Sequence, residues 1–131
     1  MMTLDPIADL FTRIRNGYLA HLPEVEAPYS NMKDAVLKVL LQGHFIGSYT
    51  VEERKGRKVF VIVLLYDGRR PALTKIGRSS TPGRRLYVGT KDIPTVLGGL
   101  GMAIVSTPSG IMTGRQAKSK NLGGELLGRV W

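Results

Sequence analysis

Apolar positions near the start of the chain recur at the spacing of one buried helix face. The pattern i, i+3, i+4, i+7 is met by Ile7, Leu10, Phe11 and Ile14. Asp5 is a suitable N-cap, and Pro6 fits the first helical position that follows it. Gly17 is the residue type that commonly ends a helix. The sequence therefore predicts a first helix from Pro6 to about Gly17.

Alternating and clustered apolar residues then predict a small unit of one strand, one helix and two more strands. Val25 and Ala27 alternate with polar residues inside an extended segment, residues 18–29. A second helix is expected from Ser30 as N-cap to Gly43, with its apolar face formed by Ala35, Val36, Val39 and Leu40. Residues 45–51 and 59–65 are predicted strands, joined as a hairpin through residues 52–58.

The second half of the chain is patterned as short strands and tight turns. Strands are predicted over residues 73–76, 84–88, 102–105 and 125–131. Asp92 is expected to cap a short helix that ends near Gly98, and Thr113 with Gln116 has capping-box spacing before a basic helical turn.

A turn signal at Asp67-Gly68 separates these two patterns. We place a domain boundary there, giving an N-terminal α/β domain, residues 1–66, and a C-terminal domain, residues 67–131. The predicted fold class is α+β, with the two small α/β domains packed together.

The charge is distributed unevenly between these halves. The chain has 19 Lys and Arg against 10 Asp and Glu, a net charge of +9. Residues 1–65 hold eight basic and seven acidic side chains, whereas residues 66–131 hold eleven basic and three acidic ones. Such segregation indicates that the second half meets a polyanion, and nucleic acid is the usual one. The alternative is a charge that serves only solubility.

Composition also excludes several classes of protein. The longest continuous apolar run, residues 59–65, is far shorter than the ~18 residues that a membrane-spanning helix needs. The N-terminus lacks the pattern of a signal peptide, so a cytoplasmic protein without a membrane partner is the default expectation. The absence of cysteine excludes disulfides, thiol catalysis and Cys-ligated zinc.

Residues 106–110 carry the strongest chemical signal in the chain. Ser106 and Thr107 leave the end of an apolar strand, and Pro108, Ser109 and Gly110 follow them. Hydroxyl and backbone N–H groups on a rigid support suit phosphates, base edges and the 2′-OH of RNA. The alternative is an ordinary turn closed by Gly110.

Several basic clusters accompany this segment. On a strand, Arg85 and Tyr87 share one face while Arg84 takes the other, and an arginine beside an aromatic ring suits RNA through phosphate pairing and stacking. The alternative is a solvated edge strand. Further candidates are the polar Asn16 of the first helix and basic residues of the predicted hairpin tip, the basic helical turn and the first helix, namely Arg54, Lys55, Arg57, Lys58, Arg115, Lys118, Lys120, Arg13 and Arg15.

An enzymatic role has little support in the sequence. His21 and His44 stand far apart, and no metalloprotease, nucleophile-elbow or P-loop motif is present. The glycines of residues 98–101 do not continue into a dinucleotide fingerprint. A small hydrolase using Ser106 or Thr107 as nucleophile remains an alternative, without a recognisable base. We therefore predict no catalytic residue, no metal and no cofactor.

The order of these segments resembles the bacterial small-subunit ribosomal protein S-eight family over essentially the whole chain. The matching segments are residues 5–9, 12–17, 80–87, 99–101, 105–113 and 123–125. Each segment alone is a weak signal, and their common register is specific.

The resemblance implies two small α/β domains and a role as a primary binder of the central domain of small-subunit ribosomal RNA. It implies a cytoplasmic location in the ribosome beside neighbouring small-subunit ribosomal proteins, and binding to its own operon messenger RNA as a secondary role. A stand-alone regulator of messenger RNA is the corresponding alternative. The RNA-binding positions that it implies are Ser106, Thr107, Gly110, Gly123, Gly124, Glu125, Arg85, Tyr87, Asp5, Thr12, Arg15, Asn16 and Lys33.

The chain departs from the usual family pattern at four positions. Pro108 and Ser109 stand where the family has Ser and Lys, Gly114 where it commonly has Asp, and Asn31 where it has Lys. Pro108 removes a hydroxyl and a backbone N–H, and Ser109 removes a cation. These changes predict a divergent family member with a retuned RNA contact, or one whose partner RNA differs locally.

Overall fold

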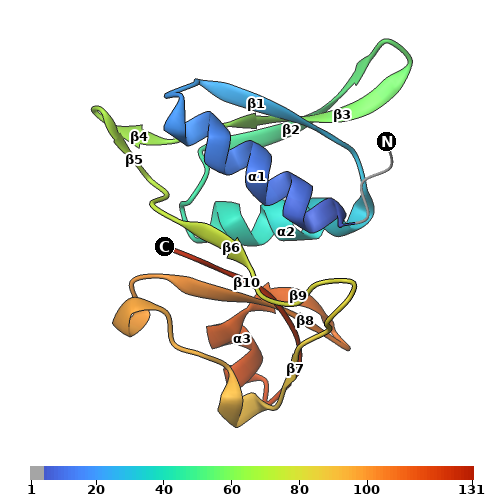
Figure 1. Cartoon of the computed structure of the whole chain (residues 1–131), viewed down its shortest axis with the longest axis vertical. Helices are drawn as coiled ribbons and strands as arrows, with labels where there is room; N and C mark the ends of the chain where they lie inside the picture. The colour runs from blue at the N-terminus through green and yellow to red at the C-terminus, as the bar shows by residue number, and fades with distance from the viewer. Residues whose placement is uncertain (1–4) are drawn as a thin grey trace.

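The computed structural model describes residues 5–131 as an α+β fold of stacked layers (Figure 1). A three-stranded sheet lies at the top of that view, two helices lie beneath it, and a five-stranded sheet lies below the helices with a short third helix on its far side. The helices α1 and α2 thus lie between the two sheets, and each contacts strands of the second sheet. The predicted fold class is confirmed.

The helices begin where the sequence predicts. Asp5 caps α1 (Pro6–Leu19), and its Oδ1 accepts a hydrogen bond from the Ala8 N–H at 3.1 Å. Ser30 caps α2 (Asn31–Gln42) through the Lys33 N–H at 3.2 Å. The expected end of α1 at Gly17 is wrong, because the helix continues by two residues. Gly17 instead allows a close approach, since a Cβ there would lie 2.4 Å from Cγ1 of Val25.

The first sheet has the order β1-β3-β2 and is antiparallel throughout. Its strands are β1 (Glu24–Pro28), β2 (Ser48–Arg54) and β3 (Arg57–Val63). The predicted hairpin is present, but the strand bounds expected for it, residues 45–51 and 59–65, and the connection over residues 52–58 are wrong, because β2 and β3 pair up to Arg54 and Arg57. The turn contains only Lys55 and Gly56, and positive φ at both positions suits the twist of hairpin strands. A short hairpin of β4 (Tyr66–Asp67) and β5 (Arg70–Pro71) follows.

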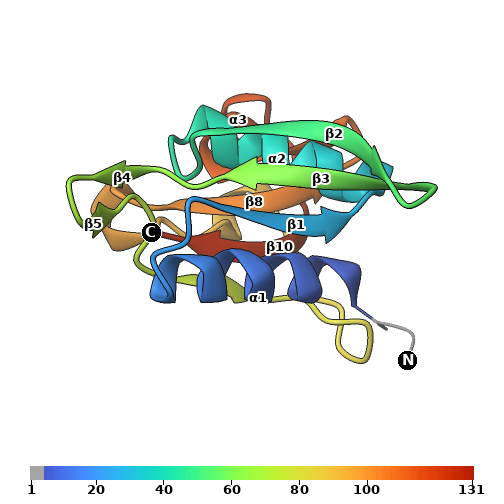
Figure 2. The ribbon, with the colours of Figure 1, turned by 90° about the horizontal axis from the view of Figure 1, so that it is seen from above.

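The second sheet has the order β6-β10-β8-β9, and β7 also pairs with β10. Its strands are β6 (Ile76–Arg78), β7 (Tyr87–Val88), β8 (Met102–Thr107), β9 (Gly110–Thr113) and β10 (Gly124–Val130). The helix α3 (Gly114–Ser119) follows β9 directly and begins with the predicted capping box of Thr113 and Gln116. Seen from above, β10 runs along α1 in the layer beneath it (Figure 2).

Three predictions for the second half are wrong in their bounds. The strand expected over residues 73–76 starts only at Ile76, and the one over residues 84–88 is reduced to β7. The helix expected from Asp92 is replaced by two 3₁₀ turns, η1 (Thr90–Asp92) and η2 (Leu97–Gly99). Pro94 explains the last difference, because a proline blocks the helical hydrogen bond and restricts the residue before it.

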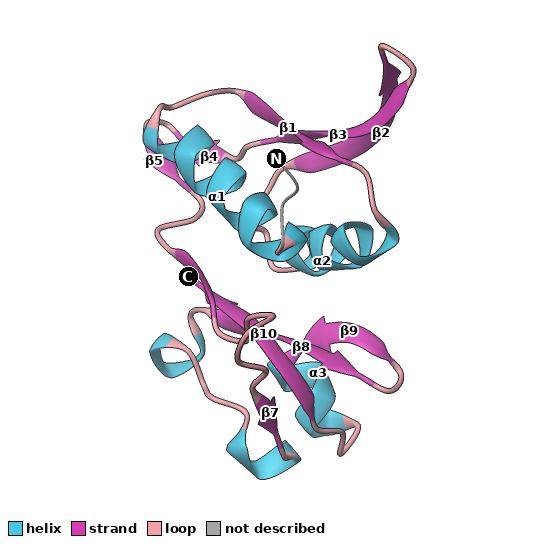
Figure 3. Ribbon diagram, turned by 45° about the vertical axis from the view of Figure 1, so that its right-hand side comes forward, coloured by secondary structure: helices cyan, strands magenta, loops and turns pink. Residues whose placement is uncertain are grey.

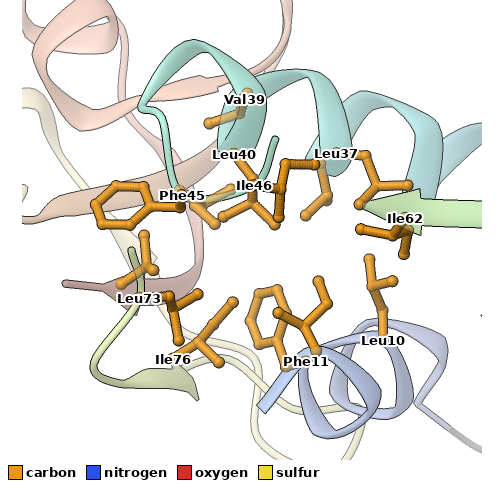
Figure 4. Packing of buried hydrophobic residues seen from close by; sticks show 14 of the residues in the cluster. Leu10, Phe11, Leu37, Val39, Leu40, Phe45, Ile46, Ile62, Leu73 and Ile76 are labelled. Carbon is orange, nitrogen blue, oxygen red and sulfur yellow. The ribbon is translucent and has the colours of Figure 1, made fainter. Parts of the chain in front are cut away.

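One continuous core joins the helices to both sheets. Figure 4 shows Leu10 and Phe11 of α1 facing Leu37 and Leu40 of α2. The same cluster takes in Phe60 and Ile62 of β3 and, from the second sheet, Ile76, Ile104, Leu127 and Val130. A smaller cluster fills the far side of the second sheet beneath α3. Because the larger cluster includes residues on both sides of position 67, the division into domains 1–66 and 67–131 stays a prediction.

Candidate nucleic-acid interface

The predicted hydroxyl loop is a tight β-hairpin in the structure. Ser106 and Thr107 are the last residues of β8, and only Pro108 and Ser109 form the turn before Gly110 opens β9 (Figure 3). Gly110 has a φ of 118°, a conformation that L side chains rarely adopt. The loop is therefore replaced by a turn of fixed shape at the end of the second sheet.

The hydroxyl of Thr107 makes its hydrogen bonds within this turn. Its Oγ1 donates to the Gly110 carbonyl oxygen at 2.8 Å and accepts from the Ser109 N–H at 3.1 Å. The residue is buried, at 8% exposure. Thr107 thus shapes the hairpin that carries Ser106, while the pairs Ser106–Ile111 and Thr107–Gly110 set its register.

Ser106 belongs to a row of polar side chains that crosses three strands. Glu125 of β10 pairs with Ser106 of β8 on one side and with Tyr87 of β7 on the other. Residues directly opposite in antiparallel strands project to the same face of a sheet. Tyr87 is 70% exposed, and Ser106 is half-buried. The second sheet therefore presents Tyr87, Glu125 and Ser106 together, and we call this set the Tyr87–Ser106 row.

Glu125 holds the guanidinium of Arg85 beside that row. Its Oε2 accepts hydrogen bonds from the Ser80 hydroxyl and, at 3.0 Å, from Nη1 of Arg85. Ser80 Oγ in turn accepts from the Leu86 N–H at 3.0 Å, which holds the segment carrying Arg85 against the sheet. Burial raises the pKa of the Glu125 carboxyl, but the hydrogen bonds from Ser80 and Arg85 and the charges of Arg85 and Arg78 outweigh it, so the pKa is lowered overall.

The lowered pKa makes the stability of this corner depend on pH. Since the folded-state pKa lies below the unfolded one, the stabilisation by Glu125 is complete above the unfolded value of 4.5 and is lost as pH falls through the folded value. We expect the free energy of unfolding to fall more steeply for the wild type than for Glu125→Gln between about pH 5 and about pH 3. Urea denaturation at each pH measures this, and identical slopes in the two proteins would contradict it.

Gly123 and Gly124 bring the backbones of this corner together. A Cβ on Gly124 would lie 2.0 Å from the carbonyl oxygen of Ser106, and one on Gly123 would lie 2.5 Å from that of Val88. Only glycine at position 124 permits this close approach of β10 to β8. Of the predicted positions, Gly124 and Glu125 therefore lie beside Ser106, and Gly123 lies beside Val88 and Gly89.

Other predicted RNA-binding residues lie away from the row. Arg115 and Lys118 are exposed on α3, which packs on the opposite side of the second sheet through Ala117. The Lys118 ammonium lies 3.5 Å from Oγ1 of Thr95. Arg84 lies next to Arg85 in the chain but lines a cavity to which no residue of the row belongs.

The first-helix candidates fall into two groups. Thr12 and Asn16 are exposed on α1. Asp5 is occupied by its N-cap bond and by an ion pair with Arg78 at 3.1 Å, and a guanidinium nitrogen of Arg15 donates to the Ile76 carbonyl oxygen. The structure thus gives Asp5 and Arg15 a role in joining α1 to β6.

Lys33 is buried, at 5% exposure, and its ammonium donates to the Pro28 carbonyl oxygen at 3.1 Å. Burial lowers its pKa, with a smaller opposing effect from the Asp9 carboxylate. This placement favours a structural role in tying α2 to β1.

Sequence reasoning missed two residues that build this site. Ser80 is fully buried beneath Glu125, and Arg78 donates to the Leu127 carbonyl oxygen at 2.8 Å. The signal for Ser80 was present, because a small polar residue stands two positions before the Pro82-Gly83 turn. The partner of that hydroxyl lies 45 positions away, which no local pattern reveals.

The fold and the Tyr87–Ser106 row define the chain as a small, basic α+β protein with a polar site on one sheet. The family model described as ribosomal protein S8 matches residues 5–131. Small ribosomal subunit protein uS8 of Solibacter usitatus is 46% identical over 131 residues, covering 99% of this chain and all of that protein. The relative from Dictyoglomus thermophilum is 44% identical over 131 residues and covers both chains fully.

The chain belongs to the ribosomal protein S8 family. It is a structural constituent of the small ribosomal subunit in the cytoplasm and not an enzyme, which confirms the predicted family, class and location. Among residues 5–131, no helix has the length and apolarity needed to cross a membrane.

Proposed function

We propose that the Tyr87–Ser106 row, with Arg85, binds an irregular helix in the central domain of small-subunit ribosomal RNA. The observation that supports this most directly is the register across three strands, which brings Tyr87, Glu125 and Ser106 into line. These residues were singled out from separate segments of the sequence. Family membership supports ribosomal RNA as the nucleic acid that the basic half of the chain meets.

Each member of the row has a chemistry that suits RNA. The exposed ring of Tyr87 offers a face for stacking, and Arg85 offers a guanidinium for phosphate. The Ser106 hydroxyl donates to or accepts from a 2′-OH or a base edge in the shallow minor groove. Glu125 acts as a positioning residue, because its carboxylate holds Arg85 and Ser80.

A rigid support gives this row selectivity for RNA shape. The Thr107 hydroxyl fixes the adjoining hairpin, and Gly124 sets the spacing of β10 and β8. Groups held on strands reach a duplex only where its groove has a matching width. We therefore expect the surrounding lysines and arginines to supply affinity and the row to supply discrimination.

The remaining predicted contacts form separate surfaces in this proposal. Thr12 and Asn16 on α1, and Arg115 and Lys118 on α3, would meet other parts of a folded RNA that wraps around the protein. Neighbouring small-subunit proteins are the further partners that the family implies. Binding to the protein's own operon messenger RNA would use the same row, since a messenger that copies the ribosomal helix presents the same shape.

Removing the side chains of Tyr87 and Ser106, which make no hydrogen bond to another side chain among residues 5–131, tests the proposal. We expect Tyr87→Ala/Ser106→Ala to bind a central-domain RNA fragment about a hundredfold more weakly, the sum expected of one stacking and one hydrogen-bonding contact. Fluorescence anisotropy with labelled RNA measures this. Both residues are at least partly exposed, so the variant should fold.

The matched control is Ser119→Ala, which removes an exposed hydroxyl from α3. We expect its affinity for the fragment to equal that of the wild type. A loss of less than about twofold in the double variant would reject the row as the binding site.

A further inference from the structure

A cavity of about 750 Å³ opens beside the first helix, away from the Tyr87–Ser106 row. It lies where the end of α1, the edge strand β6 and the end of β10 meet residues 84–86. Its walls include Leu19, Ile76, Leu86 and Trp131, and its cationic side chains are Arg15, Lys75, Arg78, Arg84 and Arg129.

The residues that line this cavity differ from those of the proposed RNA site, although the two sets lie close together in the sequence. Arg84 and Leu86 line the cavity, whereas Arg85 between them pairs with Glu125. Tyr87, the next residue, belongs to the row. A ligand in the cavity therefore contacts residues other than those of the row.

The charged side chains that line the cavity all carry a positive charge. No carboxylate side chain is among its lining residues. Arg78 is paired with Asp5, and Arg15 donates to Ile76. By contrast, among residues 5–131 no hydrogen bond or ion pair engages the side chains of Lys75, Arg84 or Arg129, all of which are exposed. Three cations are thus available to an anionic ligand.

The apolar wall of the cavity reaches solvent. Leu19 is 74% exposed and Leu86 is 40% exposed, and Ile76 and Trp131 lie deeper. Burying such exposed aliphatic side chains against an apolar group of a partner is favourable, because it removes apolar surface from water. An apolar pocket with a few convergent charged groups is the usual form of a binding site.

We propose that this cavity docks a segment of a neighbouring ribosomal protein that carries an aliphatic or aromatic side chain flanked by Asp or Glu. The apolar side chain would fill the space between Leu19 and Leu86, and the carboxylates would pair with Lys75, Arg84 and Arg129. The inference goes beyond the proposed RNA contact and does not depend on it.

Charge and shape together favour a protein segment over RNA here. Cationic side chains alone would suit an acidic protein segment and RNA equally well. The sugar–phosphate backbone, however, has no aliphatic group that would bury Leu19 and Leu86, whereas the core of a protein interface is built from apolar side chains with arginine. RNA recognition relies on aromatic faces and guanidinium planes, which the Tyr87–Ser106 row already offers.

Photo-crosslinking in assembled small subunits tests the proposal. Benzoylphenylalanine replaces Leu19, which is exposed and tolerates the change, and the crosslinked product is sequenced by mass spectrometry. We expect a crosslink to a protein segment in which the attached residue lies within a few positions of Asp or Glu. The same group at Leu100, which is 85% exposed and outside the cavity, should not give that product.

Charge reversal provides the second variant. Lys75→Glu/Arg129→Glu should lower the crosslink yield by about tenfold, since two attractive pairs become repulsive. Lys91→Glu/Lys120→Glu makes the same change of charge at exposed positions outside the cavity and should leave the yield unchanged. A crosslink to RNA, no crosslink at Leu19, or equal yields in the two variants would overturn the proposal.

Discussion

Replacing Gly124 with alanine is expected to destabilise the protein by about 3 kcal/mol and to weaken the proposed RNA contact by about thirtyfold. The added methyl group would lie 2.0 Å from the Ser106 carbonyl oxygen, and backbone cannot move aside as a flexible side chain does. β10 and β8 must therefore separate at the pair Glu125–Ser106. Urea denaturation and binding to the RNA fragment measure the two effects.

Gly83→Ala is the matched control for this substitution. Gly83 lies in the turn near the same segment, and a Cβ built there meets nothing within 4 Å. Its alanine variant should keep the stability and RNA affinity of the wild type. If Gly124→Ala behaved like Gly83→Ala, the close approach of β10 to β8 would have no part in shaping the site.

Phe11→Ala is expected to cost about 4 kcal/mol of stability, the middle of the range for a buried aromatic ring. Phe11 is 1% exposed on α1, and its ring packs over Gly128 of β10. It thus contacts the second sheet from the helix layer. Because the core is continuous, we expect loss of the Phe11 ring to lower the stability of residues 1–66 and of residues 67–131 together.

A single unfolding transition is the expected observation for wild type and variant alike. Trp131, the only tryptophan, reports on the end of β10, while circular dichroism at helical wavelengths reports mainly on α1 and α2. Coincident transitions from both probes indicate cooperative unfolding. Leu19→Ala on the same helix, at 74% exposure, should change stability little. Separate transitions would show instead that residues 1–66 and 67–131 unfold independently.

The first half of the fold was predictable from sequence because its signals are local. Asp5 and Ser30 cap their helices through residues three positions away, and the apolar face of α1 recurs at helical spacing. Strong periodicity over ten or more residues specifies an element with little help from tertiary contacts. The exact ends depend on packing, as the continuation of α1 past Gly17 shows.

The second half was less predictable because its strands are short and depend on distant partners. β6 and β7 each exist through pairing with β10, about fifty and forty positions away. Because the site also depends on pairing between distant strands, local sequence patterns do not reveal it. Ser106, Arg85 and Glu125 were chosen as separate signals, but their common surface follows from strand register. The burial of Lys33 and the role of the Thr107 hydroxyl within the turn also arise from contacts that composition does not show.

A salt titration of wild-type binding measures recognition by the proposed RNA site most directly. It compares a central-domain RNA fragment with a perfect duplex of equal length. We expect affinity for both RNAs to fall as salt rises, because cations release counterions from phosphates, and the preference for the fragment to persist at high salt. That preference reflects the fixed row of Tyr87, Glu125 and Ser106. Equal affinity for the two RNAs at every salt concentration would leave only a basic surface and would contradict shape recognition by this row.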